Sequence, residues 1–185
     1  YFMDNGFCVI AHYNNENENL NTIKRNGMNE CIHCDFSDDN AFNNFLQKVK
    51  SMQIEALINN AGIYDFSKNK SNRIKSIEKV IKVNLIAPVL LSEKVMDGMK
   101  KRKHGHIINI SSIGAEYGSN INNIFYGVSK RGIESATKTL AREGAKHNIL
   151  VNTIRPGVTN TDFINKLGKD IKRRIELIPL NRAME

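Results

Sequence analysis

Short apolar runs alternate along the chain with longer stretches of helical periodicity, and this alternation constrains the fold most. Five runs are expected to be strands: Phe7–Tyr13, Glu30–Phe36, Ile54–Asn60, Ile107–Ile110 and Ile149–Ile154. Five other stretches are expected to be helices: Asn14–Gly27, Ser37–Gln53, Asn72–Ile86, Pro88–Lys103 and Phe125–His147. Strands that alternate with helices of this length form a parallel sheet, so the predicted fold class is α/β with a doubly wound parallel sheet.

Two of these helices have side chains whose placement can be predicted. Ser37 is expected to cap the Ser37–Gln53 helix, with Asp38 and Asp39 in its first turn. Its inward face is expected to hold Phe42, Phe45, Leu46 and Val49. In Asn72–Ile86, one polar residue, Asn84, interrupts an apolar stripe that consists of Ile74, Ile77, Val80, Ile81 and Leu85.

Length and composition fit one domain over residues 1–185, since 41% of the residues are hydrophobic and 25% are charged. No apolar run approaches the ~20 residues that span a bilayer, so we expect no membrane partner. The net charge of +8 is partly carried by stretches such as Lys100–Lys103 and Lys172–Arg174, which are typical of solvated helix faces. We expect no nucleic-acid partner, because no basic stripe is interleaved with aromatic residues.

The three cysteines, Cys8, Cys31 and Cys34, do not form a disulfide framework. The run from Cys31 to Cys34 contains half of a zinc site, but structural zinc takes four ligands and no second Cys/His pair has suitable spacing. We therefore expect no metal and three free thiols. Reduced cysteines favour a cytoplasmic location.

The stretch from Gly105 to Lys130 places three reactive groups near one edge of the predicted sheet. Ser111 and Ser112 follow an apolar strand, and Tyr126 and Lys130 lie one turn apart on the helix that comes next. Ligands of open α/β sheets bind outside the carboxyl ends of the strands. A lysine ammonium favours a neighbouring phenolate, so Lys130 is expected to lower the pKa of Tyr126 below the usual ~10. These groups fit proton transfer coupled to hydride transfer, although a Tyr/Lys pair at this spacing also occurs on helix surfaces by chance.

Four motifs together resemble the short-chain dehydrogenase/reductase family, in its single-domain branch, and within it the 3-oxoacyl-acyl-carrier-protein reductases. They are Tyr126-Gly-Val-Ser-Lys130, the strand end Asn109-Ile-Ser-Ser112, Asn59-Asn-Ala-Gly62, and Arg155-Pro-Gly-Val-Thr-Asn-Thr161. The resemblance covers nearly the whole chain and implies a Rossmann-like fold.

The resemblance implies four catalytic residues. Tyr126 would exchange the proton, and Ser112 would orient the substrate oxygen. Lys130 would lower the Tyr126 pKa and bind the nicotinamide ribose, and Asn84 would hold a water on the proton path. We prefer Ser112 to Ser111, because the loop from Ser112 to Tyr126 is about one residue longer than in the acyl-carrier-protein reductases.

The resemblance also implies contacts to the cofactor. They comprise Asp35 and Phe36 beside the adenine; Asn60, Ala61 and Gly62 near the adenosine ribose; and Pro156, Gly157, Thr159 and Thr161 at the nicotinamide and phosphates. An acid at the end of the second strand of the family fold would mark NAD. That position is occupied by Tyr13 or Asn14. We therefore prefer NADP(H) to NAD(H).

The glycine-rich phosphate loop of the family, with its first strand, has no counterpart in the sequence, and neither does the last strand. We therefore expect the domain to be incomplete at both ends. The segment Asp162–Glu185 is expected to form a mobile substrate lid. Family members commonly pair the helix that matches Phe125–His147, which implies a homodimer or homotetramer.

The predicted function is an NAD(P)(H)-dependent oxidoreductase that interconverts a carbonyl and an alcohol in a small-molecule substrate. One alternative is a catalytically idle dinucleotide-binding sensor or scaffold of the same fold. The four catalytic residues argue against it, because an idle site has no need of all four. Another is a sugar-nucleotide epimerase or dehydratase of the extended branch, which also uses Tyr-x-x-x-Lys. The Asn59–Gly62 and Pro156-Gly157 motifs fit the single-domain branch better.

Overall fold

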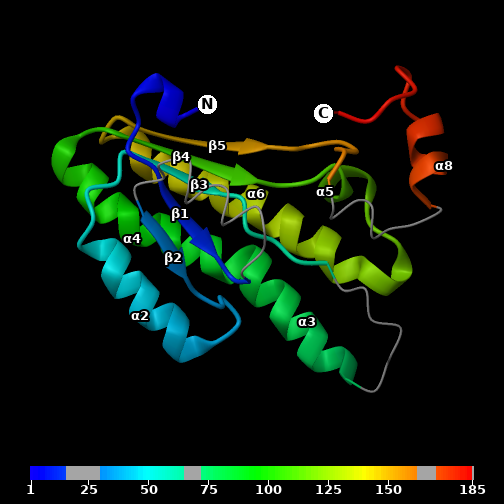
Figure 1. The fold of residues 1–185 in the computed structure, drawn as a ribbon, viewed down its shortest axis with the longest axis horizontal. Coiled ribbons are helices and arrows are strands. Elements are labelled where there is room, and N and C mark those ends of the chain that lie inside the picture. The colour runs from blue at the N-terminus through cyan, green and yellow to red at the C-terminus, as the bar shows by residue number, and fades with distance from the viewer. Residues whose placement is uncertain (16–29, 65–71, 162–169, 185) are drawn as a thin grey trace. The chain divides into compact units, whose positions relative to one another are not determined.

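The computed structural model describes residues 1–15, 30–64, 72–161 and 170–184, and it has the predicted α/β character (Figure 1). The chain forms two compact units, Tyr1–Met52 and Gln53–Glu185. Most of the predicted helix Asn14–Gly27 and the first part of the predicted lid lie outside the described residues.

The Tyr1–Met52 unit contains two parallel strands and one α-helix within its described residues. After a 3₁₀ turn, η1 (Met3–Asn5), come β1 (Ile10–Tyr13), β2 (Glu30–His33) and α2 (Asp39–Lys50). Ile10 pairs with Glu30, and Tyr13 pairs with His33. Gly6 ends the 3₁₀ turn in the left-handed region with φ 83°, a conformation that glycine adopts without steric cost.

The start of α2 differs from the prediction by one residue. Asp38, and not Ser37, is the N-cap, and its carboxylate accepts a hydrogen bond of 2.7 Å from the backbone N–H of Ala41. The Ser37 hydroxyl instead donates to Asp35 Oδ1 at 2.6 Å. The predicted inward face is confirmed, because the four apolar residues are all buried: Phe42, Phe45, Leu46 and Val49.

The Gln53–Glu185 unit contains a three-stranded parallel sheet in the order β3-β4-β5. Its strands are β3 (Ala56–Asn59), β4 (Gly105–Ile110) and β5 (Ile149–Ile154). Its helical segments are α3 (Arg73–Ile81), η3 (Lys82–Ile86), α4 (Ala87–Arg102), α5 (Gly114–Tyr117), η4 (Ile121–Asn123), α6 (Ile124–Ala145) and α8 (Asp170–Glu176). Helices α4 and α6 cover one face of this sheet (Figure 1).

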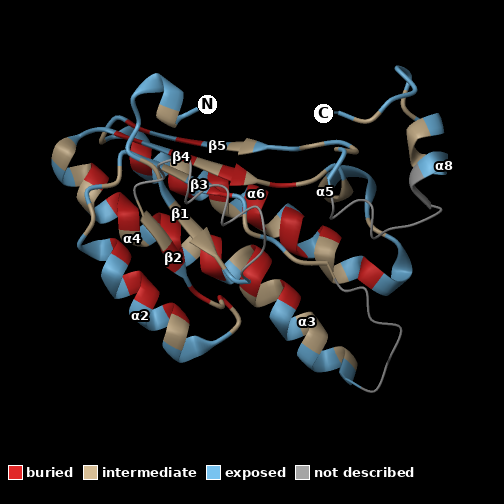
Figure 2. Cartoon of the chain, viewed as in Figure 1, coloured by how far each residue is buried: buried red, intermediate tan, exposed pale blue. Residues whose placement is uncertain are grey.

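The core of this unit lies between the sheet and these two helices, as Figure 2 shows. Buried polar side chains cross it in a chain of hydrogen bonds. The Asn59 amide on β3 donates to Asn109 Oδ1 on β4 at 2.8 Å, and Asn109 donates to Thr137 Oγ1 on α6 at 2.9 Å. Thr153 on β5 also reaches Thr137, at 2.9 Å. Asn59, the first residue of the Asn59–Gly62 motif, therefore links the neighbouring strands β3 and β4 through its side chain.

Helices α3 and α4 join through a π-helical turn, η3, where the sequence predicted two helices separated at Pro88. Pro88 lacks an N–H group, so it cannot bond to the preceding turn, and the wider turn immediately before α4 accommodates this. Asn84 lies within η3 and is 1% exposed. The apolar stripe is only partly inward: Val80 is buried, but Ile74, in the first turn of α3, is 72% exposed.

Candidate active site

Two serines follow β4, and their hydroxyls have different surroundings. The backbone N–H of Ser111 donates to Ile154 O at 2.7 Å, and its buried hydroxyl donates to Glu134 Oε1 at 2.7 Å. Ser112 is half-buried; its Oγ accepts from the N–H of Gly114 at 3.1 Å and is hydrogen-bonded to the Tyr126 side chain. Of the two hydroxyls, the one on Ser112 therefore adjoins the phenol.

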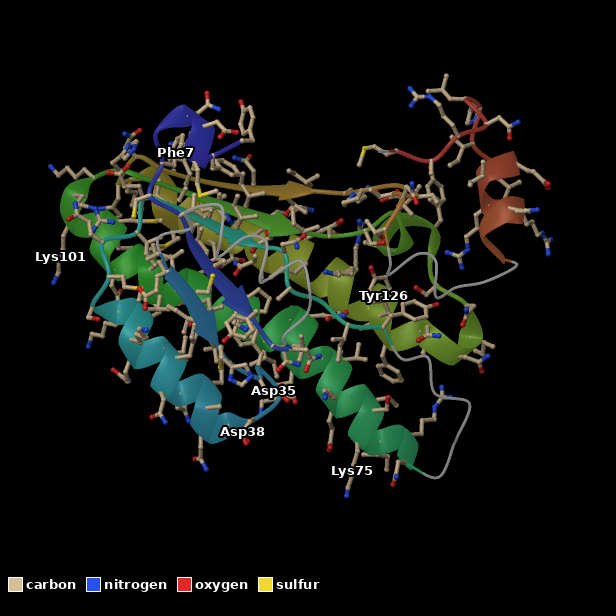
Figure 3. The ribbon with its side chains drawn as sticks, in the orientation of Figure 1. Phe7, Asp35, Asp38, Lys75, Lys101 and Tyr126 are labelled. Atoms are coloured by element: carbon tan, nitrogen blue, oxygen red, sulfur yellow. The ribbon has the colours of Figure 1, made fainter. Side chains whose placement is uncertain are left out.

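Tyr126 lies in the first turn of α6 (Figure 3). The Asn120 side chain caps the short η4 turn before it, accepting from the N–H groups of Asn122 at 3.0 Å and Asn123 at 3.1 Å. Gly127 allows α6 to approach α5 closely, because a Cβ at this position would lie 3.1 Å from the carbonyl oxygen of Gly114. The capping asparagine and the glycine thus bring the start of α6 against the loop that carries Ser112.

Lys130, one turn further along α6, is buried with 5% of its surface exposed. Its Nζ donates to the carbonyl oxygen of Ile110 at 2.8 Å and lies 5.9 Å from the centre of the Tyr126 ring. Burial lowers the pKa of Lys130 to about 8, because removal from water disfavours the charged form.

The electrostatics of Tyr126 correct one prediction. Burial raises the pKa of Tyr126 above its ordinary value, the hydrogen bond from Ser112 opposes this rise, and neighbouring Tyr64 adds to it. Lys130 does not lower this pKa in the structure, and the expected depression is wrong. The reason is that burial disfavours the phenolate, while the Lys130 ammonium is directed to Ile110 O.

Asn84 is fixed by both of its amide atoms. Oδ1 accepts from the N–H of Ile63 at 2.8 Å, and Nδ2 donates to Ile63 O at 2.9 Å. Nδ2 also contacts the hydroxyl of fully buried Ser129 at 3.3 Å, and that hydroxyl donates to Tyr126 O at 2.8 Å. Ser129 was not predicted, because a small polar residue inside a helix carries no signal of its own.

The segment after β3 brings backbone against the same group of side chains. Asn60 and Gly62 are exposed and Ala61 is half-buried. A Cβ at Gly62 would lie 3.3 Å from Lys130 Nζ and 3.5 Å from Asn84 Oδ1. The absence of a side chain at Gly62 therefore leaves room over the lysine and the asparagine.

The segment after β5 lies at the same edge of the sheet, because β4 and β5 are parallel and in register to their last residues. The carbonyl oxygen of Pro156 accepts from the N–H of Ile113 at 2.9 Å. A Cβ at Gly157 would meet nothing within 4 Å. Thr159 Oγ1 lies 3.4 Å from Gly157 O, and Thr161 Oγ1 lies 3.4 Å from Thr159 O.

The remaining predicted cofactor residues belong to the Tyr1–Met52 unit. The Tyr13 ring lies 5.4 Å from the ring of His33. Asp35 Oδ1 accepts from the N–H of Ser37 at 2.8 Å, which makes it a turn carboxylate. The Phe36 ring is buried and stacks on His12 at 3.9 Å, so the ring is not open to a ligand. Their part in cofactor binding stays a prediction.

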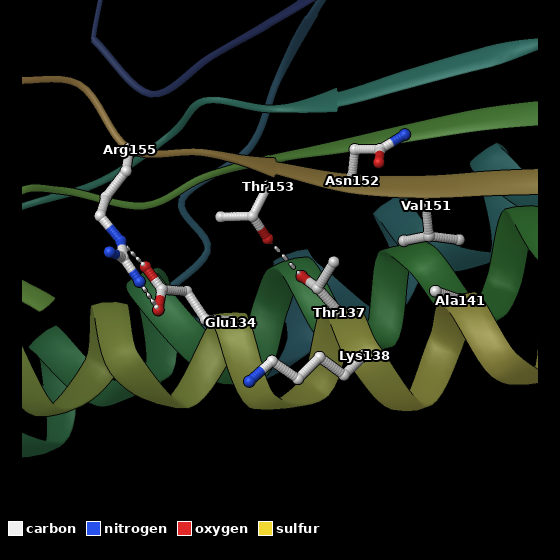
Figure 4. Close-up of a pocket in the computed structure, with 8 residues that line it drawn as sticks. All are labelled: Glu134, Thr137, Lys138, Ala141, Val151, Asn152, Thr153 and Arg155. Atoms are coloured by element: carbon white, nitrogen blue, oxygen red, sulfur yellow. Dashed lines mark hydrogen bonds and ion pairs between the residues drawn. The ribbon is translucent and has the colours of Figure 1, made fainter. Parts of the chain in front are cut away.

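An ion pair between the buried Glu134 and the more exposed Arg155 was not predicted. Glu134 on α6 accepts two hydrogen bonds from Arg155, one of 2.7 Å from Nε and one of 2.8 Å from an η nitrogen (Figure 4). These bonds are the main reason why the pKa of Glu134 falls to about 2. A charged residue on a helix is usually solvated, and its partner is far away in sequence, so no sequence signal indicates the pair.

Within the described residues, no helix is both long and apolar enough to cross a membrane. The same residues contain no group of three or more His, Cys, Asp or Glu side chains placed to hold a metal ion. The three cysteines are free thiols, as predicted.

A parallel sheet flanked by helices, with polar groups gathered at its carboxyl edge, defines a Rossmann-like α/β protein. The family model for the short chain dehydrogenases matches residues 1–172, and the chain belongs to this family.

The chain is 33% identical over 161 residues to carbonyl reductase family member 4 of Xenopus laevis, covering 86% of this chain and 67% of that protein. It is 34% identical over 161 residues to the 3-oxoacyl-[acyl-carrier-protein] reductase FabG of Aquifex aeolicus, covering 86% and 64%. The chain thus spans about two thirds of the length of these relatives.

Solved structures agree in fold. A 4-hydroxyisoleucine dehydrogenase complexed with NADH superposes with a TM-score of 0.87 and 30% identity, covering all of this chain and 78% of that one. A gluconate 5-dehydrogenase of Beutenbergia cavernae, described as putative and solved with bound NADP at low occupancy, gives a TM-score of 0.79 at 25% identity, covering 89% and 68%.

Proposed function

We propose that this protein is an NAD(P)(H)-dependent oxidoreductase that interconverts a carbonyl and an alcohol. The observation that carries the proposal is the joint placement of Ser112, Tyr126 and Lys130. The Ser112 hydroxyl is hydrogen-bonded to the Tyr126 phenol, and the buried Lys130 ammonium lies 5.9 Å from the centre of the tyrosine ring. Membership of the short chain dehydrogenases supports the same reaction class.

In the reductive direction, Tyr126 donates its proton to the carbonyl oxygen of the substrate. The raised pKa of Tyr126 keeps the phenol protonated at neutral pH, which suits a proton donor. Ser112 holds the same oxygen through its hydroxyl. Lys130 binds the ribose of the cofactor, and Asn84 supports the water from which Tyr126 recovers its proton.

The residues at the carboxyl edge fit a nicotinamide cofactor. Gly62 leaves space beside Lys130 Nζ, and Gly157 has no neighbour that a Cβ would meet. Both positions therefore permit a ligand to approach the backbone closely. When bound, the nicotinamide would supply or accept the hydride. Asn60, Ala61, Pro156, Thr159 and Thr161 are proposed to line the same site.

We propose NADP(H) as the preferred cofactor. Neither Tyr13 nor Asn14, at the end of β1, carries the carboxylate that would bind a ribose 2′-hydroxyl. Affinities for NADPH and NADH, measured by fluorescence titration of the full-length protein, test this choice. Tighter binding of NADPH supports it, and tighter binding of NADH contradicts it.

A carbonyl panel followed by the absorbance of the reduced nicotinamide tests the reaction. The panel includes 3-oxoacyl thioesters, since relatives are named 3-oxoacyl-[acyl-carrier-protein] reductase and acetoacetyl-CoA reductase. Net cofactor oxidation that depends on the substrate supports the proposal. Binding of the cofactor without turnover would favour a sensor, and conversion of a sugar nucleotide with the cofactor returned unchanged would favour an epimerase.

We propose a cytoplasmic homodimer or homotetramer that uses the face formed by α4 and α6. Exposed apolar side chains on these helices support an interface: Leu90 at 38%, Ile124 at 44% and Val128 at 51%. The oligomeric states of the wild type and of Val128→Glu, measured by light scattering, test this interface. A monomeric wild type would contradict the proposal.

A further inference from the structure

One buried carboxylate joins three segments at the carboxyl edge of the sheet. Glu134 lies one turn after Lys130 on α6 and is 7% exposed. It accepts from Ser111 Oγ at 2.7 Å, from Arg131 at 3.0 Å, and twice from Arg155, at 2.7 and 2.8 Å. The helix is thereby bonded to the residue after β4 and to the residue after β5.

The two bonded residues immediately precede parts of the proposed site. Ser111 precedes Ser112, and Arg155 precedes Pro156 and Gly157. Backbone hydrogen bonds between the same two segments continue the strand pairing: Ser111 N–H to Ile154 O at 2.7 Å, and Ile113 N–H to Pro156 O at 2.9 Å. A shift of Ser111 or Arg155 is therefore passed directly to the next residue in the chain.

The donors around this position require a negatively charged side chain with two hydrogen-bond acceptor atoms. A carboxylate accepts the parallel pair of bonds from an arginine and still has lone pairs for Ser111 and Arg131. A glutamine amide accepts through one atom only and turns donors toward the arginine. Burial of Glu134 would be costly without such partners. Its neighbours on the inward face of α6 are Ile133, Thr137 and Leu140, among which a carboxylate without partners would be out of place.

The charged groups around Glu134 come from all the elements that adjoin it. Arg131 is its neighbour on α6, and Arg155 comes from the segment after β5. Glu116 on α5 accepts from Arg155 at 2.8 Å and lies 3.4 Å from Arg131. Lys138 lines the same open groove between α6 and β5 (Figure 4). The two glutamates and the two arginines thus balance in charge.

We propose that Glu134 is a positioning residue of the active site. Through Ser111 it holds the Ser112 hydroxyl against the Tyr126 phenol, and through Arg155 it fixes the Pro156-Gly157 turn that faces the cofactor. The inference rests on the proposed function for the roles of Ser112 and Tyr126.

The test compares Glu134→Gln and Glu134→Asp with a matched control, Glu143→Gln. The control removes an exposed ion pair from the same helix, the 2.7 Å contact with Lys100. Four quantities are measured on the full-length protein: the melting temperature, kcat, KM for NADPH, and the NMR signal of Tyr126 labelled with carbon-13 at Cζ. The signal is assigned by its absence in Tyr126→Phe, and it reports on the hydrogen bond to Ser112 without any need for turnover.

A displacement of about 1 Å in an active site costs on the order of 100-fold in rate, so we expect Glu134→Gln to lower kcat by about 10- to 100-fold. KM for NADPH should rise, and the Tyr126 signal should move. Glu134→Asp, which keeps the carboxylate, should recover part of the rate. Glu143→Gln should match the wild type in all four quantities.

If the Glu134→Gln variant folds and its Tyr126 NMR signal equals that of the wild type, the proposal is overturned, whatever the kcat of the variant. A rate that falls only in proportion to the folded fraction while KM is unchanged would also overturn it, since that is the result of a purely structural role. If Glu134→Gln does not fold, Arg155→Gln decides by the same measurements, because Arg155 is more exposed. A wild type without turnover would contradict the proposed function alone, and the NMR signal would still decide the role of Glu134.

Discussion

The Nζ atom of Lys130 donates to the carbonyl oxygen of Ile110 at 2.8 Å while it lies 5.9 Å from the centre of the Tyr126 ring. The lysine is thus held by the end of β4 rather than by the phenol. It carries its charge in a buried position, which costs folding free energy.

Replacing Lys130 with Met should stabilise the fold at pH 7. The pKa of Lys130 in the folded state, about 8, lies below its ordinary value of 10.5, and each pKa unit corresponds to about 1.4 kcal/mol. The charged form therefore costs folding free energy on the order of 3 kcal/mol below pH 8. After subtraction of the lost hydrogen bond to Ile110, we expect a gain of about 1 to 2 kcal/mol in the free energy of unfolding.

This gain in the free energy of unfolding should shrink as the pH rises from about 8 to 10.5. Over this range the lysine of the wild type is uncharged in the folded state but still binds its proton in the unfolded state, so the wild type becomes more stable. Urea denaturation at pH 7 and at pH 10 measures it. Lys138→Met, on an exposed part of the same helix, is the control and should leave the free energy of unfolding nearly unchanged. A Lys130→Met protein that is less stable than the wild type at pH 7 would contradict the account.

Adding a methyl group at Gly62 should impair the site more than the fold. The new Cβ would lie 3.3 Å from Lys130 Nζ, so the ammonium must move by a few tenths of an ångström. We expect kcat/KM to fall by about 3- to 10-fold in Gly62→Ala and further in Gly62→Val. Gly98→Ala is the control, because the atoms nearest to its Cβ, at 3.1 to 3.9 Å, belong to the Arg102 guanidinium and not to a residue of the proposed site. Equal values of kcat/KM in Gly62→Ala and in the control would argue against close approach of the cofactor at Gly62.

Removing the Asn84 amide should lower stability as well as activity. Asn84→Ala leaves the N–H and C=O of Ile63 without the bonds that the amide makes at 2.8 and 2.9 Å. Each unsatisfied group costs roughly 1 to 3 kcal/mol if it stays buried, and we expect a loss of about 2 kcal/mol. Thermal denaturation checks this against Asn152→Ala, at an exposed position of β5. A loss no larger than in Asn152→Ala would show that water replaces the amide.

Lowering the pH should reduce what the Glu134–Arg155 ion pair contributes to the free energy of unfolding. The pKa of Glu134 falls from its ordinary 4.5 to about 2, so its contribution to stability is present above pH 4.5 and is lost as the pH falls through about 2. Because Arg155 is 39% exposed, solvent screens the pair, and we expect about 1 to 2 kcal/mol rather than the 3 to 5 of a fully buried pair. Glu134→Gln should therefore be less stable than the wild type at pH 6, and the difference should narrow by pH 3. A difference that stays constant over this range would exclude the carboxylate as its source.

Much of the fold could be predicted because the spacing of apolar residues along the sequence differs between strands and helices. Strand β5 matches its predicted range residue for residue, and the buried face of α2 is the predicted one. The cap of α2 was wrong by one residue, because Ser37 and Asp38 are both good caps and only the structure shows that Asp35 engages the serine. Ile74 belongs to the apolar stripe of this helix and is nevertheless exposed, because spacing does not reveal where the neighbouring surface ends.

The candidate site was less predictable than the fold. Motifs predicted that Ser112, Tyr126 and Lys130 lie together, since Ser112 follows a recognisable strand and the other two lie on a recognisable helix. Burial is not visible in a motif, so the raised pKa of Tyr126 was missed. Glu134 was missed for a related reason: its partners Ser111 and Arg155 come from two separate strand ends, and only the parallel pairing of β4 and β5 brings them to one carboxylate.

The most direct test of the central claim is the turnover of Tyr126→Phe compared with the wild type, using NADPH and NADH and the carbonyl panel. General acid catalysis contributes typically 10²- to 10⁴-fold, so we expect kcat to fall by about that factor. Affinity for the cofactor should stay within about 2-fold, because the phenol is proposed to act on the substrate oxygen and an interaction made only in the transition state leaves binding unchanged. A variant that binds the cofactor and reduces the carbonyl at the wild-type rate would contradict the proposed mechanism.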